Sequence, residues 1–233
     1  MRIEPEISDL AVVLLGDFNP AIFTPAWFTL HGLLPRAADS ADLKVAHRQV
    51  AEFSIDWLRL QVTSDRFAAN TEQAPHVRVK DLVMRVFKEH LSHTPLRAMG
   101  INRSVHFRVG GLAERDRIGR TLAPVEPWGR WAAELGVDGE QGGMTSLTMC
   151  QVSPTGRPRG GSVNVKVEPS RRIGQGRSGI FVEVNDHYVA DSGDTGGSSQ
   201  LMEFLDRQFD TSIRRADEII DHMMSLAQAR EGE

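Results

Sequence analysis

The sequence predicts an α+β protein with antiparallel sheet and a long C-terminal helix. Three observations support this prediction. Apolar residues alternate with period two in several short segments between residues 50 and 189, and glycine- and proline-rich turns separate those segments. From Leu201 to Leu226, apolar residues recur at three- and four-residue steps. The hydrophobic fraction of 40% and the charged fraction of 25% are those of an ordinary folded protein.

The first two elements are a strand and a short helix. Residues 7–18 contain a compact apolar run that ends at Gly16, which is typical of a buried strand followed by a turn. Thr24 then has the position of a helix N-cap. Pro25 follows at the first helical position, where its missing N–H costs nothing, and the helix should run to about Leu34.

The next segments predict a loop and then strands. Residues 37–42 are small and polar, which favours a loop. Residues 50–62 alternate with period two, and a slip of phase at Trp57 indicates a bulge or bend within one strand. Residues 67–71 could return as the second arm of a hairpin.

A second helix and a long strand complete the first half. Helical spacing of apolar residues covers residues 79–91, and Pro95 ends that helix. Residues 96–109 alternate again, with His106 on the polar side. The resulting order is β-α-β-β-α-β, and we therefore predict a ferredoxin-like N-terminal subdomain over residues 1–118.

The second half, residues 119–233, is predicted to be a three-stranded antiparallel meander followed by the long helix. A charged, glycine-punctuated segment from Gly110 to Gly119 marks the boundary, and a short helix covers residues 128–135. Turn sequences separate the strand candidates, which are residues 146–152, 162–168 and 179–189. Ser198 or Ser199 can cap the last helix, whose length of about 45 Å could reach a neighbouring subunit.

Composition excludes several classes of protein. The longest early apolar stretch is far shorter than the roughly 20 residues of a membrane span, and no signal peptide precedes it. The single cysteine, Cys150, cannot form an internal disulfide, which favours the cytoplasm. The eight histidines lack metal-binding spacing, so we expect neither a metal nor another cofactor.

Arginines near the predicted meander suggest an alternative function in nucleic-acid binding. The net charge of -4 argues against a globally basic binder. Locally, however, flexible glycines beside arginines can approach a phosphate backbone closely, although no aromatic stacking platform is evident. The candidate residues are Arg157, Arg159, Arg171, Arg172 and Arg177.

A second glycine-rich segment precedes the last helix. Asp191 and Asp194 each begin an Asp-Ser/Thr-Gly triplet, the loop that carries the catalytic carboxylate in aspartic proteases. Here the triplets are adjacent rather than facing each other, so a hydrolase is a weaker alternative. Gly196 and Gly197 lie where a helix N-terminus could bind an anion, but the two carboxylates would repel it.

Four segments carry a resemblance that spans nearly the whole chain. They are residues 18–27 (FNPAIFTPAW), 99–103 (MGINR), Trp128 and 204–213 (FLDRQFDTSI). In these segments the sequence resembles a sporadically distributed family of bacterial proteins without an established activity. The resemblance implies an architecture and no catalytic signature. Patchy distribution of this kind is associated with mobile elements or defence islands.

Strong structural periodicity without a convergent catalytic set predicts a non-catalytic interaction or assembly protein, such as an accessory subunit of a bacterial complex. The expected partner is another protein or a second copy of the chain, bound through the C-terminal helix or the sheet edges.

Overall fold

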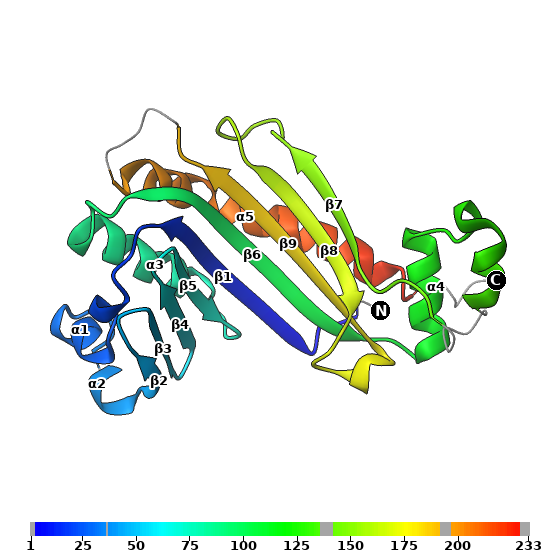
Figure 1. Ribbon diagram of the computed structural model, residues 1–233, viewed down its shortest axis with the longest axis horizontal. Helices are drawn as coiled ribbons and strands as arrows, with labels where there is room; N and C mark the ends of the chain where they lie inside the picture. The colour runs from blue at the N-terminus through cyan, green and yellow to red at the C-terminus, as the bar shows by residue number, and fades with distance from the viewer. Residues whose placement is uncertain (1–2, 36, 136–141, 192–196, 229–233) are drawn as a thin grey trace.

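One antiparallel sheet of nine strands organises the molecule, in the order β2-β3-β4-β5-β1-β6-β9-β8-β7 (Figure 1). This computed structural model describes residues 3–35, 37–135, 142–191 and 197–228. The strands are β1 (Ile7–Gly16), β2 (Asp42–Ala46), β3 (Val50–Ile55), β4 (Leu58–Thr63), β5 (Arg66–Thr71), β6 (Leu96–Arg108), β7 (Leu147–Val152), β8 (Ser162–Pro169) and β9 (Gly179–Val189).

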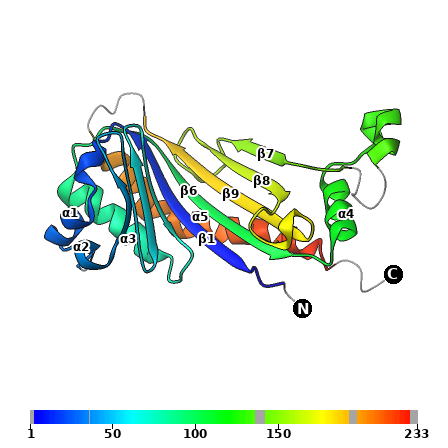
Figure 2. The same cartoon turned by 60° about the horizontal axis from the view of Figure 1, so that its bottom comes forward.

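The C-terminal helix, α5 (Ser199–Ser225), crosses one face of the sheet, and α4 (Leu112–Leu122) lies beyond one end of the strands (Figures 1 and 2). The α-helices are α1 (Pro25–Leu30), α2 (Ala37–Ser40), α3 (Val77–Arg85), α4 (Leu112–Leu122) and α5 (Ser199–Ser225). Short irregular helices are η1 (Pro20–Ile22), η2 (Val86–His90), η3 (Glu126–Leu135) and η4 (Gly174–Gly176). Among the described helices, none is long and apolar enough to cross a membrane.

The predicted ferredoxin-like layout is not confirmed. β1 lies between β5 and β6. The other edge of β6 pairs with β9, from Ala98↔Val189 to Arg108↔Gly179. The strands predicted as a separate meander therefore extend the first sheet, and there is one large sheet instead of two. The α+β class, the antiparallel pairing and the C-terminal helix are confirmed. The sheet runs across the predicted division between residues 118 and 119.

The segment predicted as one bent strand is a hairpin. β3 and β4 pair as far as Ile55↔Leu58, so Asp56 and Trp57 form a two-residue turn. Asp56 has a φ of 30°, a conformation that aspartate tolerates in tight turns. The slip of phase at Trp57 marks this reversal of the chain.

Among the remaining elements, the sequence predicts the start of α1 correctly but does not predict α2, β2 or α4. The Thr24 side chain caps α1 as predicted, because its Oγ1 accepts a hydrogen bond from the Trp27 N–H at 3.2 Å. Residues 37–42, predicted as a loop, contain α2 and the first residue of β2. The charged segment predicted as a boundary, residues 110–119, contains most of α4, whose charged residues are partly or fully buried and obscure its apolar spacing.

The helix face of the sheet holds the core in two parts. Phenylalanines dominate the part beneath α1 and α3, where the Phe67 and Phe87 rings are 5.1 Å apart. Aliphatic residues such as Val182 form the other part, against the C-terminal half of α5. Half of the stripe predicted on α5 is fully buried here, in Leu201, Leu205, Phe209, Ala216 and Ile220, and Met202 and Met224 are buried beside it.

Ser198 precedes α5 but does not cap it with its side chain. Its buried hydroxyl instead donates to backbone carbonyls at the end of the preceding helical segment, 2.5 Å from the Phe87 oxygen and 3.1 Å from the Ser92 oxygen. This contact fixes the start of α5 against η2.

Candidate functional site

The face of the sheet opposite the helices is polar, and no described helix covers its centre (Figure 2). Side chains alternate along each strand, so Leu10 and Val12 of β1 enter the core while Asp9 and Ala11 point to the other side. We call this second side the open face. On β6 it carries Asn102, Ser104 and His106.

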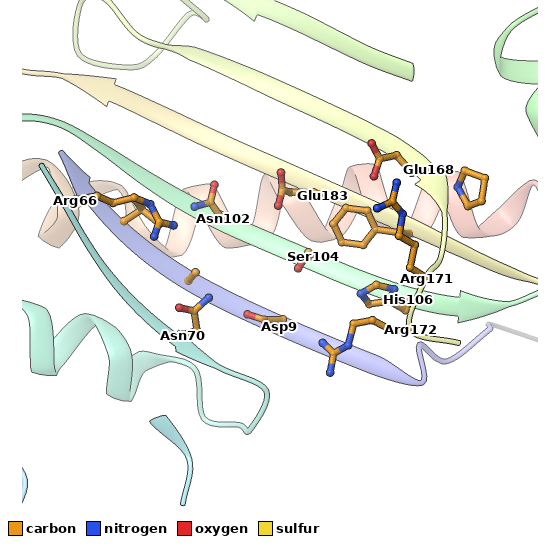
Figure 3. Close-up of a pocket in the computed structure, with 14 residues that line it drawn as sticks. Asp9, Arg66, Asn70, Asn102, Ser104, His106, Glu168, Arg171, Arg172 and Glu183 are labelled. Atoms are coloured by element: carbon orange, nitrogen blue, oxygen red, sulfur yellow. The ribbon is translucent and has the colours of Figure 1, made fainter. Parts of the chain in front are cut away.

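A cavity of about 380 Å³ lies on the open face, over β5, β1, β6 and β9 (Figure 3). The connection from β8 to β9 closes one end of it, through Arg171 and Arg172. Its other lining residues are Asp9, Ala11, Val13, Arg66, Asn70, Asn102, Ser104, His106, Glu168, Pro169, Phe181 and Glu183.

Two carboxylates flank a hydroxyl in the centre of this cavity. Asp9 pairs with Ser104, and Ser104 pairs with Glu183, so the three residues form a row across three strands (Figure 3). Two strand spacings separate the carboxylate-bearing residues by about 10 Å. Within the described parts of the chain, neither carboxylate has a hydrogen bond or ion pair. A cationic or donor-rich group can therefore bind between them.

The environment of Asp9 disfavours its charge. Burial is the main cause that raises the pKa of Asp9 from 3.8 to about 6, and the negative charge of Glu72 adds to it. Arg172 and Arg103 act in the opposite direction without offsetting the burial. A positive group bound beside Asp9 would favour the ionised carboxylate.

His106 is held in one orientation at the closed end of the cavity. The Ser170 hydroxyl oxygen accepts hydrogen bonds from the backbone N–H groups of Arg172 and Ile173, both at 3.2 Å. Its own hydrogen is therefore directed to His106 Nδ1, 2.7 Å away, which assigns the remaining proton to Nε2. Burial lowers the pKa of His106, and Arg172 lowers it further. Both effects favour the neutral ring, which lies 4.8 Å from the Phe181 ring, centroid to centroid.

Asparagines form a second row across the open face. Asn102 pairs with Asn185, which pairs with Asn164, and Asn70 lies two strands away from Asn102 in the same row. The side-chain oxygens of Asn102 and Asn185 are buried and accept no hydrogen bond from the described residues. Together with the carboxylates, they make this face rich in free acceptors.

The five arginines predicted to bind nucleic acid are not gathered in one surface. Arg171 and Arg172 lie at the cavity, and Arg172 forms an ion pair with Glu72 at 2.8 Å. Arg159 is exposed between β7 and β8, and Arg177 is exposed beyond η4.

The Arg157 side chain is fully buried on the helix side of the sheet, where a phosphate cannot reach it. Its guanidinium pairs with Asp186 and lies 4.2 Å above the Tyr188 ring. Asp186 also accepts a hydrogen bond from Arg215 of α5 at 2.7 Å. These residues form a buried ion cluster that joins the β7–β8 connection, β9 and α5.

The aspartate loop before α5 is described only in part, because Asp194 and Gly196 lie outside the described residues. The Asp191 carboxylate is engaged locally and accepts a hydrogen bond from Gln200 Nε2 at 2.6 Å. Gly197 has a φ of +108°, and a side chain there would meet the Ser92 carbonyl oxygen. Close packing therefore explains this glycine.

The sequence interpretation did not select Asp9, Asn102, Ser104 or Glu183. The signal that could have found them is the period-two series of polar residues in β6, whose side chains share one face. Asp9 and Glu183 lie on the neighbouring strands, opposite Ser104, and the sequence alone does not show which strands pair.

Comparison with known proteins adds no family assignment, since neither a protein-family model nor a curated protein matches the chain. Among the described residues, no three His, Cys, Asp or Glu side chains are close enough to hold a metal ion.

Proposed function

We propose that this protein is a non-catalytic interaction protein that binds its partner on the open face. The observation that carries the proposal is the row of Asp9, Ser104 and Glu183, in which two free carboxylates flank a hydroxyl inside a cavity. Such a surface is complementary to a lysine or arginine side chain or another donor-rich group. The free oxygens of Asn102 and Asn185 add acceptors for the same partner.

The geometry offers less support for catalysis. His106 accepts its hydrogen bond from Ser170 through Nδ1, and burial favours the neutral ring. Among the described residues, Ser104 therefore has no hydrogen-bonded base of the kind that activates a nucleophilic hydroxyl. The open face is suited to recognition by charge and hydrogen bonding.

The long helix is less suited to partner binding than the open face. The apolar stripe of α5 packs against the sheet, from Leu201 to Met224, and is not available to another protein. Nucleic acid is also a weaker candidate, because Asp9, Glu168 and Glu183 offset the three arginines that line the cavity and leave no excess of positive charge there. The bacterial family, its link to mobile elements or defence, and the cytoplasmic location remain predictions from the sequence.

Affinity purification from the organism that encodes the protein tests the proposal. The tagged chain should enrich a specific partner, and the double variant Asp9→Asn, Glu183→Gln should reduce that enrichment at least tenfold. The matched control is Glu203→Gln, Asp210→Asn, which removes two exposed charges from α5 on the other side of the sheet. Equal enrichment by both double variants, or no enrichment above an empty tag, would overturn the proposal.

A further inference from the structure

The outer edge of β7 has the features of a pairing surface. β7 is the last strand of the sheet, and its side chains are exposed on both faces. Met149 is 65% exposed and Val152 is 75% exposed. The strand contains no charged residue and no proline. An edge of this composition is a template for another strand.

The opposite edge of the sheet, strand β2, is protected against pairing with another strand, whereas β7 is not. β2 carries Asp42 and Lys44, which pair with each other at 2.5 Å, and its register with β3 is irregular between Leu43 and Val45. Charges and bulges are the devices by which natural proteins prevent pairing at sheet edges. β7, with the regular register that it keeps with β8, has neither.

The hydrogen-bond phase of β7 identifies the residues that face outward. Just beyond the strand, the Ser153 N–H donates to the Gly161 oxygen at 3.2 Å, so alternate residues back along β7 (151, 149 and 147) bond to β8. The Ser170 N–H donates to the Gly179 oxygen at 2.8 Å, so even-numbered residues of β8 bond to β9 and odd-numbered ones bond to β7. The partners of those odd-numbered residues on β7 are again 147, 149 and 151. Thr148, Cys150 and Val152 therefore direct their N–H and C=O groups outward.

We propose that two copies of this chain pair through β7, antiparallel, with a two-fold axis at Cys150. The three outward residues are centred on Cys150, so this register pairs Thr148 of each copy with Val152 of the other and satisfies every outward group. A two-fold interface must be self-complementary, and an uncharged strand meets itself without repulsion. The occupant that this symmetry favours is a second copy. The proposal is independent of the partner on the open face.

A pair of exposed tryptophans lies at one end of the same edge. Trp128 and Trp131 of η3 are 63% and 55% exposed, with ring centroids 5.8 Å apart. They share a cavity of about 280 Å³ with Thr145 and Ser146, just before β7. In the proposed register, Ser146 lies opposite Pro154 of the second copy. The β7–β8 connection of each copy would then lie beside the tryptophan cavity of the other, which extends the interface beyond the two strands.

Pairing in this register would also join the two open faces. Cys150 lies in the same row as Asn164 and Asn185, on the face that carries the cavity. The row would continue through both Cys150 residues into the asparagines of the second copy. The dimer would therefore present two cavities on one continuous surface, suited to a partner with repeated binding groups.

The single cysteine allows a direct test with the natural chain. Directly opposed, hydrogen-bonded residues of antiparallel strands have Cα atoms about 5.5 Å apart, within disulfide range. We expect light scattering to give a dimer, and mild oxidation to link it covalently through Cys150. Cys150→Ser should remain dimeric without the link. Cys150→Lys, which opposes two positive charges at the axis, should be monomeric with an unchanged far-ultraviolet circular dichroism spectrum.

A mixing experiment tests the register. In the Cys150→Ser background, Thr148→Cys and Val152→Cys copies should form disulfides with each other, and neither should form them alone. A monomer at every concentration would overturn the proposal. So would a dimer that Cys150→Lys leaves intact, or one whose mixed copies do not cross-link.

Discussion

Asp9 is held in the open face at an energetic cost. No described hydrogen bond or ion pair stabilises its carboxylate, and burial raises its pKa to about 6. Groups that destabilise a fold in this way are concentrated at functional sites, where a ligand supplies the missing interaction. A partner's cation would recover the lost free energy by compensating the carboxylate. The same destabilisation should be measurable in the free energy of unfolding of the protein without its partner.

We expect Asp9→Asn to stabilise the free protein at about pH 8. Because the folded pKa of about 6 exceeds the ordinary 3.8, the folded state holds the proton more tightly, and ionisation disfavours folding. The cost is complete above the folded pKa and disappears as the pH falls below the ordinary value. The full shift corresponds to about 3 kcal/mol, and partial solvent exposure reduces the expected gain to about 1–2 kcal/mol.

Urea unfolding of the natural chain and the variant at about pH 8 and pH 4.5 measures this effect. The gain should fall by more than half at the lower pH, where the folded Asp9 is largely protonated while the unfolded carboxyl, with its ordinary pKa of 3.8, is still mostly ionised. A gain of equal size at both pH values, or a loss of stability at pH 8, would show that Asp9 does not carry the cost.

At the scale of elements, the buried ion cluster connects three segments that are distant in the sequence. Arg157 comes from the β7–β8 connection, Asp186 from β9 and Arg215 from α5. Asp186 is the acid between the two guanidinium groups, and Tyr188 also donates a hydrogen bond to it at 3.3 Å. Through the Arg157 side chain, the cluster anchors the β7–β8 connection to β9 and α5, and therefore helps to position the edge strand.

Asp186→Asn should destabilise the protein by about 3 kcal/mol, because it leaves two arginines near each other in a buried site without their counter-charge. Asp210→Asn, on the exposed side of α5, should change the free energy of unfolding by no more than about 0.5 kcal/mol. Urea unfolding of both variants provides the comparison. Similar values for the two would mean that the cluster contributes little to stability.

Local patterns predicted elements well where the signal lies within one segment. The Thr24 cap and the stripe of α5 are examples, since neither depends on distant residues. The sequence predicts one bent strand in place of the β3–β4 hairpin, because alternation on both sides of a two-residue turn resembles that of a bulged strand. β2 was not predicted, because its alternation of Leu43 and Val45 with charged residues is only five residues long and lies next to a segment predicted as a loop.

At the scale of the whole molecule, pairing between distant strands creates both the sheet and the site. β6 joins the first half of the chain to β9 in the second, and Ser104 meets Glu183 across that contact. Asp9 joins them through β1. The polar alternation of β6 could be predicted from the sequence, but the identity of its neighbours could not, because a long-range register leaves no local pattern.

Assembly through β7 predicts an alternating response of backbone amides to dimerisation. Residues 147, 149 and 151 donate to β8 in any state, so their hydrogen exchange should be slow in monomer and dimer alike. Residues 148, 150 and 152 donate only across the proposed axis. Their exchange should be fast in the Cys150→Lys monomer and should slow in the natural chain as its concentration rises through the dissociation constant. Residue-resolved exchange by NMR measures both sets in one experiment. A concentration effect shared by all six amides would indicate association by another surface, whereas the alternation follows only from an added strand.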